Sequence, residues 1–307
     1  MDILLAPITS VEIEGGEDVA LADGVTIRTA DAGPYRQFIV DAMRSAYGGL
    51  MPDTRYEQSD WRSTCEVSVR RPAVSDAAKL SQLVLSALRL VGPGEYDFLI
   101  WIVAQQEGGT YQALEVAWPP NPLPDLERTR RVLLSAEDLL ILRSLYHSLT
   151  SVDIASRPLI SRALLWFDRS YGHYLQTDRI LAHMVGLEAL YLEEHDELAY
   201  RLALRCAFLI EPEPDRRAAI FQVVKAAYNK IRSVHIHGGQ AKDEVGTPVG
   251  TFGIDDLAVL TEELLRRSIT TYLKIARSIA QDAGIRKLLD DHILKGPRSE
   301  LSRYLRT

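Results

Sequence analysis

Cysteine is almost absent from this chain of 307 residues, which has only Cys65 and Cys206. Neither belongs to a C-x-x-C pair, which argues against a disulfide scaffold and against a thiolate zinc site, and fits a reducing, cytoplasmic compartment. The longest apolar run, near residues 98–104, is far too short to cross a bilayer, so we expect no membrane association. The N-terminus has early acidic residues and no basic segment, so we do not expect a signal peptide.

Several motifs that identify enzymes are also missing. No glycine-rich loop follows the G-x-G-x-x-G or G-x-x-x-x-G-K-[ST] pattern between a strand and a helix, so we expect no nucleotide-phosphate loop. The chain has no G-x-S-x-G nucleophile elbow and no H-E-x-x-H zinc motif. Its formal net charge is −7. Any bound nucleic acid must therefore meet a local basic patch on an acidic protein.

The rest of the composition, 47% hydrophobic and 25% charged, is that of a globular protein with a sizeable core. Residues 1–125 are predicted to form an α+β domain. The sequence does not show its role, and sensing or regulation is the hypothesis for it. Segment 118–124 contains four prolines, which exclude a regular helix or a central strand, and we place the domain boundary there. The expected strands are 3–5, 11–13, 25–27, 65–69, 96–104 and 111–117, and the expected helices are 34–47 and 74–90.

Residues 126–285 are predicted to form a helical domain. Ser135 followed by Asp138 resembles a capping box and should begin its first helix. Residues 239–253 are predicted to be a loop, and residues 286–307 a basic C-terminal tail. The expected helices are 135–149, 158–171, 177–193, 197–210, 221–237 and 255–282.

The helix expected before Gly239 ends in the most reactive set of side chains in the chain, namely Arg232, Ser233, His235 and His237. Arginine presents a planar, permanently charged fork that matches a phosphate, and histidine accepts a proton near neutral pH. Together the two side chains are sufficient to cleave RNA without a metal, because a base can activate a 2'-hydroxyl while the arginine stabilises charge on the phosphoryl oxygens.

The sequence leaves open which histidine would be the base. On an ideal helix Arg232 and His235 are about 60° apart, whereas Arg232 and His237 are about 140° apart. Regular geometry therefore favours His235. Two glycines follow His237 directly, however, and helical geometry relaxes there.

Tyr228, Arg232-Ser233 and His237-Gly238 form the pattern Y-x3-RS-x3-HG, which resembles the signature of the Apea-like group of HEPN domains. The flanking segments 164–171, 186–194 and 198–210 resemble helices of that family in the same order. The resemblance covers residues 135–280. The N-terminal domain has no motif that we can assign.

The resemblance implies an up-and-down helical bundle. Many HEPN proteins are metal-independent endoribonucleases, often toxins or effectors of bacterial antiviral defence, with a composite site across a homodimer. By the same resemblance, Arg232 would bind phosphate, His237 would be the general base or acid, and Ser233 would be the polar residue that follows the arginine. His235 stands where the family more usually has an apolar or variable residue, so its part stays open.

Other residues are candidates for supporting roles. Glu188 lies in an otherwise apolar helix face, and it would either orient Arg232 or simply face solvent. The pair Arg266-Arg267 and the start of the basic tail, Arg286-Lys287, are candidates for contacts with the RNA backbone.

Metal and cofactor chemistry have little support in the sequence. His235 and His237 would diverge by about 160° on a helix, so they do not form a natural metal pair. The other possible ligands are His195 with Glu193 and Glu194. We therefore expect no metal and no cofactor.

Two functional hypotheses follow. The first is an endoribonuclease that acts on RNA as a homodimer, with an antitoxin or a trigger as a further partner. The second is a non-catalytic HEPN scaffold, used for RNA binding or dimerisation, in which Arg232 and His237 are a structural pair at a helix end. A catalytic site should keep the two residues accessible, whereas a scaffold should bury them or pair them with acids.

Overall fold

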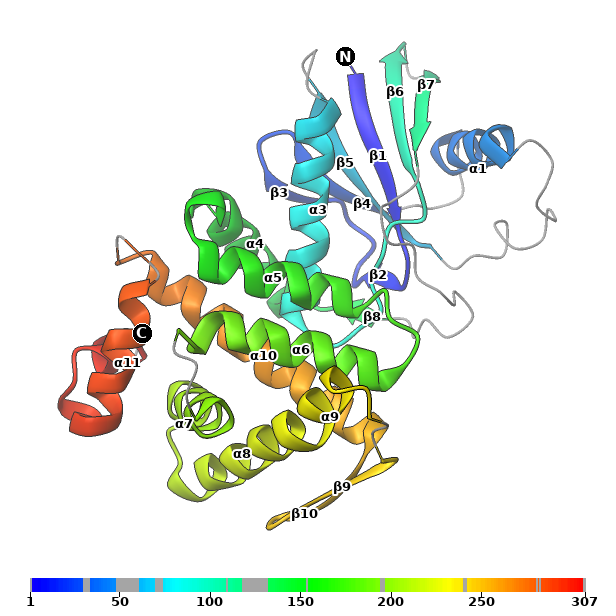
Figure 1. Ribbon diagram of the computed structural model, residues 1–307. Helices are drawn as coiled ribbons and strands as arrows, with labels where there is room; N and C mark the ends of the chain where they lie inside the picture. Colours follow the sequence, from blue (N-terminus) through cyan, green and yellow to red (C-terminus); the bar gives the residue numbers. More distant parts are fainter. Residues whose placement is uncertain are drawn as a thin grey trace. The chain divides into compact units, whose positions relative to one another are not determined.

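The computed structural model describes residues 2–29, 34–47, 61–69, 74–108, 110–117, 132–152, 154–193, 197–239, 242–279, 281 and 283–305. The chain divides into two compact units, Met1–His147 and Ser148–Thr307. The first contains the main sheet and the second is mostly helical, which confirms the predicted order of an α+β part followed by a helical part (Figure 1). The division falls inside helix α4 (Ala136–Ser151), later than the predicted boundary at 118–124, which lies outside the described residues.

The first unit is built on six antiparallel strands in the order β3-β4-β5-β1-β6-β7. A separate parallel pair joins β2 to β8. The sequence did not predict strands β3 and β8. It also did not predict a hairpin in the second unit, at residues 244–253. The strands are β1 (Asp2–Ile8), β2 (Val11–Ile13), β3 (Val19–Ala22), β4 (Val25–Thr29), β5 (Ser63–Val69), β6 (Trp101–Glu107), β7 (Thr110–Ala117) and β8 (Val132–Leu134).

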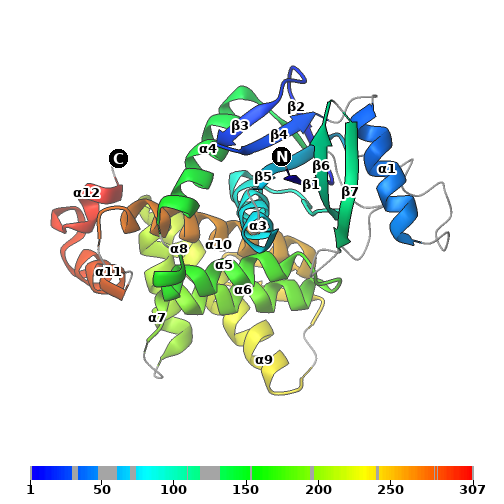
Figure 2. The same ribbon diagram turned by 90° about the horizontal axis from the view of Figure 1, so that it is seen from above.

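Two helices cover the faces of this sheet. Side chains alternate along a strand, so Ile3 and Leu5 of β1 share one face and pack there with Ile39 and Met43 of α1 (Pro34–Tyr47). Helix α3 (Val74–Val91) lies on the other face (Figures 1 and 2). At the start of α4 the predicted capping box is present, since Ser135 N and Oγ both donate to Asp138 Oδ2 and Asp138 N donates to Ser135 Oγ.

The second unit packs its helices around α6. Its elements are η2 (Ile154–Ser156), α5 (Pro158–Ser170), α6 (Gln176–Tyr191), α7 (Leu198–Ile210), α8 (Pro214–Ala227), η3 (Tyr228–Arg232), α9 (Ser233–Ile236), β9 (Glu244–Thr247), β10 (Gly250–Gly253), α10 (Ile254–Ala276), α11 (Ala283–Lys295), η4 (Gly296–Arg298) and α12 (Leu301–Leu305). Helix α6 contacts α5, α7, α10 and η3. None of the described helices is long and apolar enough to cross a membrane.

Gly186 allows the close approach of α6 to its neighbours. A Cβ atom at this position would lie 2.7 Å from Leu265 Cδ2 and 3.4 Å from the carbonyl oxygen of Ala163. An added Cβ atom would therefore require the Leu265 side chain of α10 to shift, whereas it would make an ordinary van der Waals contact with α5. The glycine is therefore needed for packing rather than for an unusual backbone conformation.

Two buried arginines close the C-terminal end of α6, where the last carbonyl groups have no partner within the helix. Arg286 donates through Nε to Leu190 O (2.8 Å) and through Nη2 to Ala189 O (2.7 Å). Arg205 donates to Tyr191 O (2.5 Å) and forms a bidentate pair with Asp290. Positive charge is favourable at this end of the helix dipole.

Three predictions for the C-terminal region were wrong. The loop expected at 239–253 contains the β9–β10 hairpin. The last long helix ends at Ala276 and not at 282, and Arg157 from the start of α5 donates to the carbonyl oxygens of Ala276 and Ile279. The segment 286–307 is not a free tail, because α11 and α12 are helical and bury Leu289 and Leu301.

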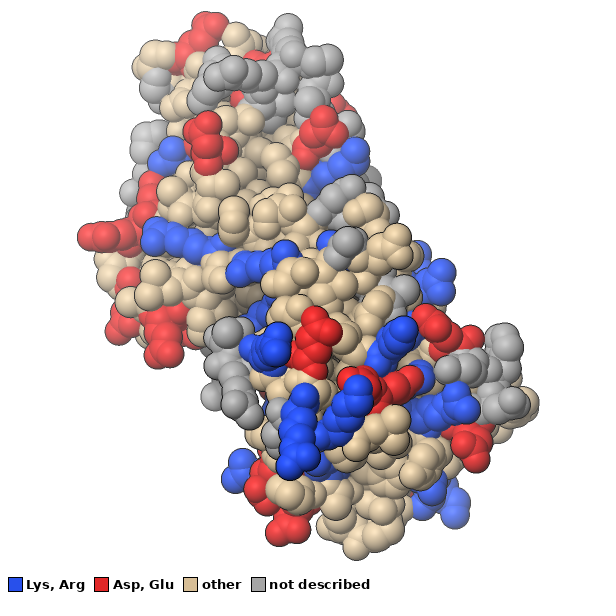
Figure 3. Space-filling view, turned by 90° about the vertical axis from the view of Figure 1, so that its left-hand side faces the viewer, with Lys and Arg blue, Asp and Glu red and all other residues tan. Residues whose placement is uncertain are grey.

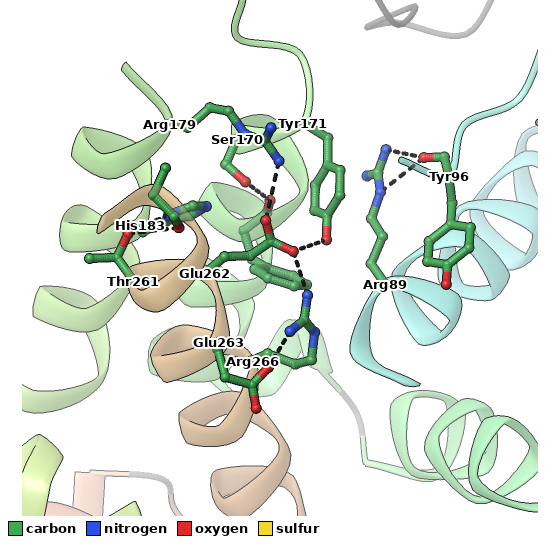
Figure 4. A network of polar contacts seen from close by, with 12 residues as sticks. Arg89, Tyr96, Ser170, Tyr171, Arg179, His183, Thr261, Glu262, Glu263 and Arg266 are labelled. Atoms are coloured by element: carbon green, nitrogen blue, oxygen red, sulfur yellow. Dashed lines mark hydrogen bonds and ion pairs between the residues drawn. The ribbon is translucent and has the colours of Figure 1, made fainter. Parts of the chain in front are cut away.

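A buried carboxylate, Glu262, organises the polar contacts between α5, α6 and α10 (Figure 4). It accepts hydrogen bonds from Tyr171 Oη (2.8 Å) and Arg179 Nη2 (3.2 Å), and it pairs with Arg266. Glu263 forms a further pair with Arg266. A buried carboxylate needs donors of this kind, because leaving its oxygens unpaired in the interior would be costly.

His183 lies beside this network and is completely buried. Its Nδ1 is 3.0 Å from Thr261 Oγ1, whose hydroxyl donates to Ala258 O. The imidazole must therefore carry its proton on Nδ1 and donate it to Thr261, which leaves Nε2 unprotonated and without a hydrogen bond to any described residue. Burial lowers the pKa of His183 well below its ordinary value. The positive charges of Arg179 and Arg266, and then His173, lower the pKa further.

We expect Arg286→Met to lower the free energy of unfolding by roughly 1.5–3 kcal/mol, because a charged donor to two helix-end carbonyls is lost. The matched control is Lys287→Met, which changes an exposed neighbour and should stay within about 0.5 kcal/mol of wild type. Urea denaturation followed by circular dichroism measures both variants. Equal stability of the two would contradict the role given to Arg286.

We expect acid to destabilise the protein through His183. The unfolded chain takes up a proton below about pH 6.5 whereas the folded chain does not, so the free energy of unfolding should fall by up to about 1.4 kcal/mol per pH unit from this residue. In His183→Asn, whose amide can replace Nδ1 without titrating, the pH dependence between about pH 6.5 and pH 5 should be shallower. A variant with the same slope as wild type would exclude this origin.

Candidate functional site

The chain enters the candidate site through an irregular helix. Helix α8 continues into a π-helical turn, Tyr228–Arg232, in which the amide of Ser233 donates to the carbonyl oxygen of Tyr228 five residues earlier. The short α9 follows and ends at His237. The regular helix predicted from 221 to 237 is therefore wrong between Tyr228 and Arg232. Such π turns are common at functional sites because one extra residue in a turn redirects the side chains after it.

Arg232 points from this turn to Glu188 of α6. Its Nη2 donates to Glu188 Oε2 (3.0 Å) and its Nε lies 2.7 Å from Oε1, although that second contact is not angled as a hydrogen bond. The side chains are 22% and 19% exposed, so the pair is mostly shielded from water. The structure therefore selects the first of the two roles left open for Glu188, since its carboxylate contacts Arg232 instead of facing solvent alone.

Glu188 occupies only one edge of the guanidinium group. Nη1 of Arg232 makes no hydrogen bond to a described residue, and the Arg232 side chain keeps 22% of its surface exposed. The guanidinium can thus offer its Nη1–Nη2 edge to a phosphate while its other edge is held by Glu188. The ring of Tyr228 makes a cation–π contact with the same guanidinium group, since Arg232 Cζ lies 5.0 Å from the centre of the ring.

The environment changes the acidity of both neighbours of Arg232. Burial raises the pKa of Glu188, and the hydrogen bond and charge of Arg232 offset only part of that rise. Burial also raises the pKa of Tyr228, with a further rise from the negative charge of Glu188 and a reduction from Arg232. The phenol is therefore neutral at physiological pH, and Arg232 favours the charged form of the Glu188 carboxyl group.

His235 contacts a different part of α6. Its Nε2 lies 3.7 Å from Asp178 Oδ1, and the ring is 41% exposed. Asp178 and Glu188 are ten residues apart, about 15 Å along the helix axis. Arg232 and His235 therefore point to two separate places on α6. The prediction that regular geometry makes His235 the neighbour of Arg232 does not hold for their side chains.

His237 differs from Arg232 and His235 in that its side chain has no partner among the described residues. It is exposed, and its ring makes no hydrogen bond or ion pair with any residue that the structure describes, while its backbone amide donates to Ser233 O (3.2 Å). Gly238 follows with φ +76°, which ends the helix in a left-handed conformation. Ser233 is half-buried, and its hydroxyl likewise has no partner among the described residues.

Most of the cations predicted to bind RNA form hydrogen bonds or ion pairs within the folded chain. Arg266 is buried between Glu262 and Glu263, Arg267 donates to Ile210 O, and Arg286 caps α6. Each guanidinium contacts carboxylate or carbonyl groups of the folded chain, and Arg266 and Arg286 are buried, whereas the Arg267 side chain is 41% exposed. These contacts weigh against the role predicted for Arg266 and Arg286, and RNA binding by Arg267 stays a prediction. Lys287 alone of the four is exposed with no ion pair to a described residue.

Basic residues do gather on one face of the molecule, where acidic side chains stand among them (Figure 3). Exposed cations of α10 to α12 are Lys274, Arg277, Lys287, Lys295, Arg298 and Arg303. Lys295 is paired with Asp291 at 2.6 Å. The surface is thus mixed in charge, and it does not form a continuous basic stripe.

No group of three or more His, Cys, Asp and Glu side chains is placed for a metal within the described ranges. Glu194 and His195, two of the possible ligands, lie outside those ranges. Both cysteines are buried, and burial raises the pKa of each thiol, that of Cys206 to about 12. They are therefore unsuited to nucleophilic chemistry.

The sequence did not point to Asp178, because its contact with His235 joins two helices and leaves no local pattern. The spacing of Tyr228 and Arg232, four residues apart, was the one available signal for their stacking.

Comparisons of this chain with protein-family models, with curated proteins and with solved structures found no match. Its function must therefore be inferred from the geometry of the site and from the resemblance in the sequence.

We expect Arg232→Met to raise the pKa of Glu188 further, because the cation that offsets part of the effect of its burial is removed. A buried carboxyl group with a raised pKa prefers its protonated form in the folded state, so this variant should lose stability as the pH rises from about 4.5 through the new pKa. Thermal unfolding at several pH values measures the effect. In the control Glu188→Gln/Arg232→Met the added pH dependence should be absent, and its persistence would contradict the assignment.

Proposed function

We propose that this chain is a metal-independent endoribonuclease of the HEPN type, in which Arg232 binds the scissile phosphate and His237 transfers the proton. The observation that carries the proposal is the combination of a guanidinium held by Glu188 with its Nη1 edge open and a solvent-exposed imidazole five residues later. The Y-x3-RS-x3-HG pattern and the order of the surrounding helices support it. The expected setting is bacterial antiviral defence or a toxin system.

The reaction would proceed by attack of a ribose 2'-oxygen on the adjacent phosphorus. His237 takes the proton from the 2'-hydroxyl as the new bond between oxygen and phosphorus forms. Arg232 stabilises the negative charge that builds on the phosphoryl oxygens. The bond to the 5'-oxygen then breaks, and that oxygen takes up a proton, which leaves a 2',3'-cyclic phosphate on one product and a 5'-hydroxyl on the other.

The proposal includes a homodimer with a composite site. A single copy presents one open guanidinium edge and one imidazole, whereas acid–base chemistry on both the attacking and the leaving oxygen is served best by two proton-transfer groups. A second copy would supply another His237. His235, near Asp178, is then a secondary group in the reaction.

The pairing of Arg232 with Glu188 favours the second candidate function, a non-catalytic scaffold that binds RNA or dimerises. In that case the ion pair is a structural contact between α6 and the π turn. The exposure of His237 favours the nuclease, because a structural histidine at a helix end normally bonds to nearby carbonyl groups.

We expect purified protein to cut a mixed RNA pool in the presence of EDTA and to leave 2',3'-cyclic phosphate ends. Arg232→Ala and His237→Ala should each lower the rate by at least 100-fold, about the loss expected for a missing proton-transfer group or oxyanion donor. His235→Ala should keep most of the activity. The products are measured by gel electrophoresis and by enzymatic tests of the RNA ends.

The matched control is Lys230→Ala, which removes an exposed cation two residues before Arg232 and only ends a hydrogen bond to Gly246 O. It should cut as wild type does. If the wild-type dimer cuts nothing that the Arg232 and His237 variants do not also cut, the scaffold is the better description.

A further inference from the structure

Aromatic and basic side chains lie along α8 in the direction of the candidate site. Tyr200 of α7 packs edge-on against Phe221 of α8, with ring centres 5.5 Å apart. Lys225 Nζ lies 5.7 Å from the centre of the Phe221 ring, and no ion pair joins this ammonium group to an acid in the described part of the chain. Tyr200 is 48% exposed, and Phe221 and Lys225 are partly exposed.

These residues continue the line that ends at Arg232. Phe221, Lys225 and Tyr228 are separated by four and then three residues, the spacing that places side chains on one stripe of a helix. Arg232 Cζ then stacks on Tyr228. From Phe221 to Arg232 the stripe covers eleven residues, about 16 Å of helix. Aromatic rings and cations alternate along it, and we call it the α8 stripe (Tyr200, Phe221, Lys225, Tyr228 and Arg232). Tyr228 is only 6% exposed, so the rings that a base can reach are those of Tyr200 and, in part, Phe221.

An alternation of this kind fits one class of ligand. Single-stranded nucleic acids expose the faces of their bases, which stack on aromatic side chains, and their phosphates interact with nearby cations. A duplex keeps its bases stacked inside and shows a protein mainly phosphate and sugar. The exposed Tyr200 ring offers such a face, and Lys225 and Arg232 offer two positive charges at separate points along the stripe.

We propose that the α8 stripe binds single-stranded RNA and guides it to Arg232. This proposal rests on the proposed function for its direction, because the strand would run from Tyr200 toward the phosphate-binding edge of Arg232. It adds the substrate class, namely unpaired RNA selected by base stacking and not by a broad basic surface. Selection by stacking also agrees with the formal net charge of −7.

The test is direct binding with an oligonucleotide that cannot be cut. Fluorescence anisotropy would compare a labelled 2'-O-methyl RNA of about 12 nucleotides, single-stranded, with the same sequence in a duplex. We expect the single strand to bind at least about tenfold more tightly, and Tyr200→Leu and Phe221→Leu each to weaken it by about tenfold or more. Leucine keeps the apolar packing between α7 and α8 but removes the ring.

Two controls separate stacking from general effects. Leu294→Ala removes an apolar side chain that is 84% exposed on α11, and it should leave the affinity unchanged. Lys225→Ala should lower the slope of log affinity against log salt by about 0.7, the value for one phosphate contact on a single strand, whereas Lys274→Ala on α10 should not. Circular dichroism establishes that each variant is folded.

Equal affinity for duplex and single strand, or unchanged binding by both leucine variants, overturns the proposal. The outcome is distinct from that of the nuclease test. Binding through the stripe without cleavage of unmodified RNA would keep the stripe and reject the nuclease. If wild type cleaves RNA, and Tyr200→Leu and Phe221→Leu bind and cleave RNA as well as wild type does, the nuclease proposal stands and the proposal for the α8 stripe is rejected.

Discussion

The capping of helix α6 by Arg205 and Arg286 is the interaction on which the helical unit depends. The last carbonyl groups of α6 lie in the interior, where an unpaired acceptor costs about as much as a lost hydrogen bond. Both arginines come from other helices, so the end of α6 can form only when α7 and α11 have packed against it. Glu188 lies within the last turn of this helix. Its carboxylate is thereby held in a fixed position, and the direction of Arg232 follows from it.

Under the proposed function, the ion pair with Glu188 would have two opposite effects on phosphate binding by Arg232. Glu188 restricts the guanidinium to one orientation, which lowers the entropy lost when a ligand binds. Its negative charge also repels a phosphate that approaches the open edge. Burial weakens the second effect, because the raised pKa of Glu188 makes this carboxyl group easier to neutralise than an exposed one. A site of this design binds one phosphate in a defined geometry, and it does not attract polyanions from a distance.

The periodic parts of the fold could be predicted from the sequence, and the parts that depend on distant contacts could not. The limits of α1, the strand Val11–Ile13 and the Ser135–Asp138 capping box follow from local patterns, which is why the structure confirms them. The end of α10 at Ala276 is set by Arg157, which is more than a hundred residues away. The cationic segment after 285 looked like a tail because the partners of Arg286 lie on another helix. The π turn at Tyr228–Arg232 contains no proline or glycine that would have indicated it.

The same distinction applies to the site. Glu188 was identified as a possible partner of Arg232 because its carboxylate stands in an otherwise apolar helix face, and the structure brings the two together. An ideal helix, however, placed His235 beside Arg232. Arg232 and His235 instead contact α6 at two places about 15 Å apart, because Arg232 pairs with Glu188 and His235 lies beside Asp178. His237 has no partner of this kind among the described residues, so its ring is not held in place by the folded chain. Under the proposed function, the substrate or a second copy must therefore fix His237 for proton transfer, because a base acts only when it is held within hydrogen-bond reach of the proton. Arg232 is thus positioned before the ligand arrives, and His237 is positioned by it.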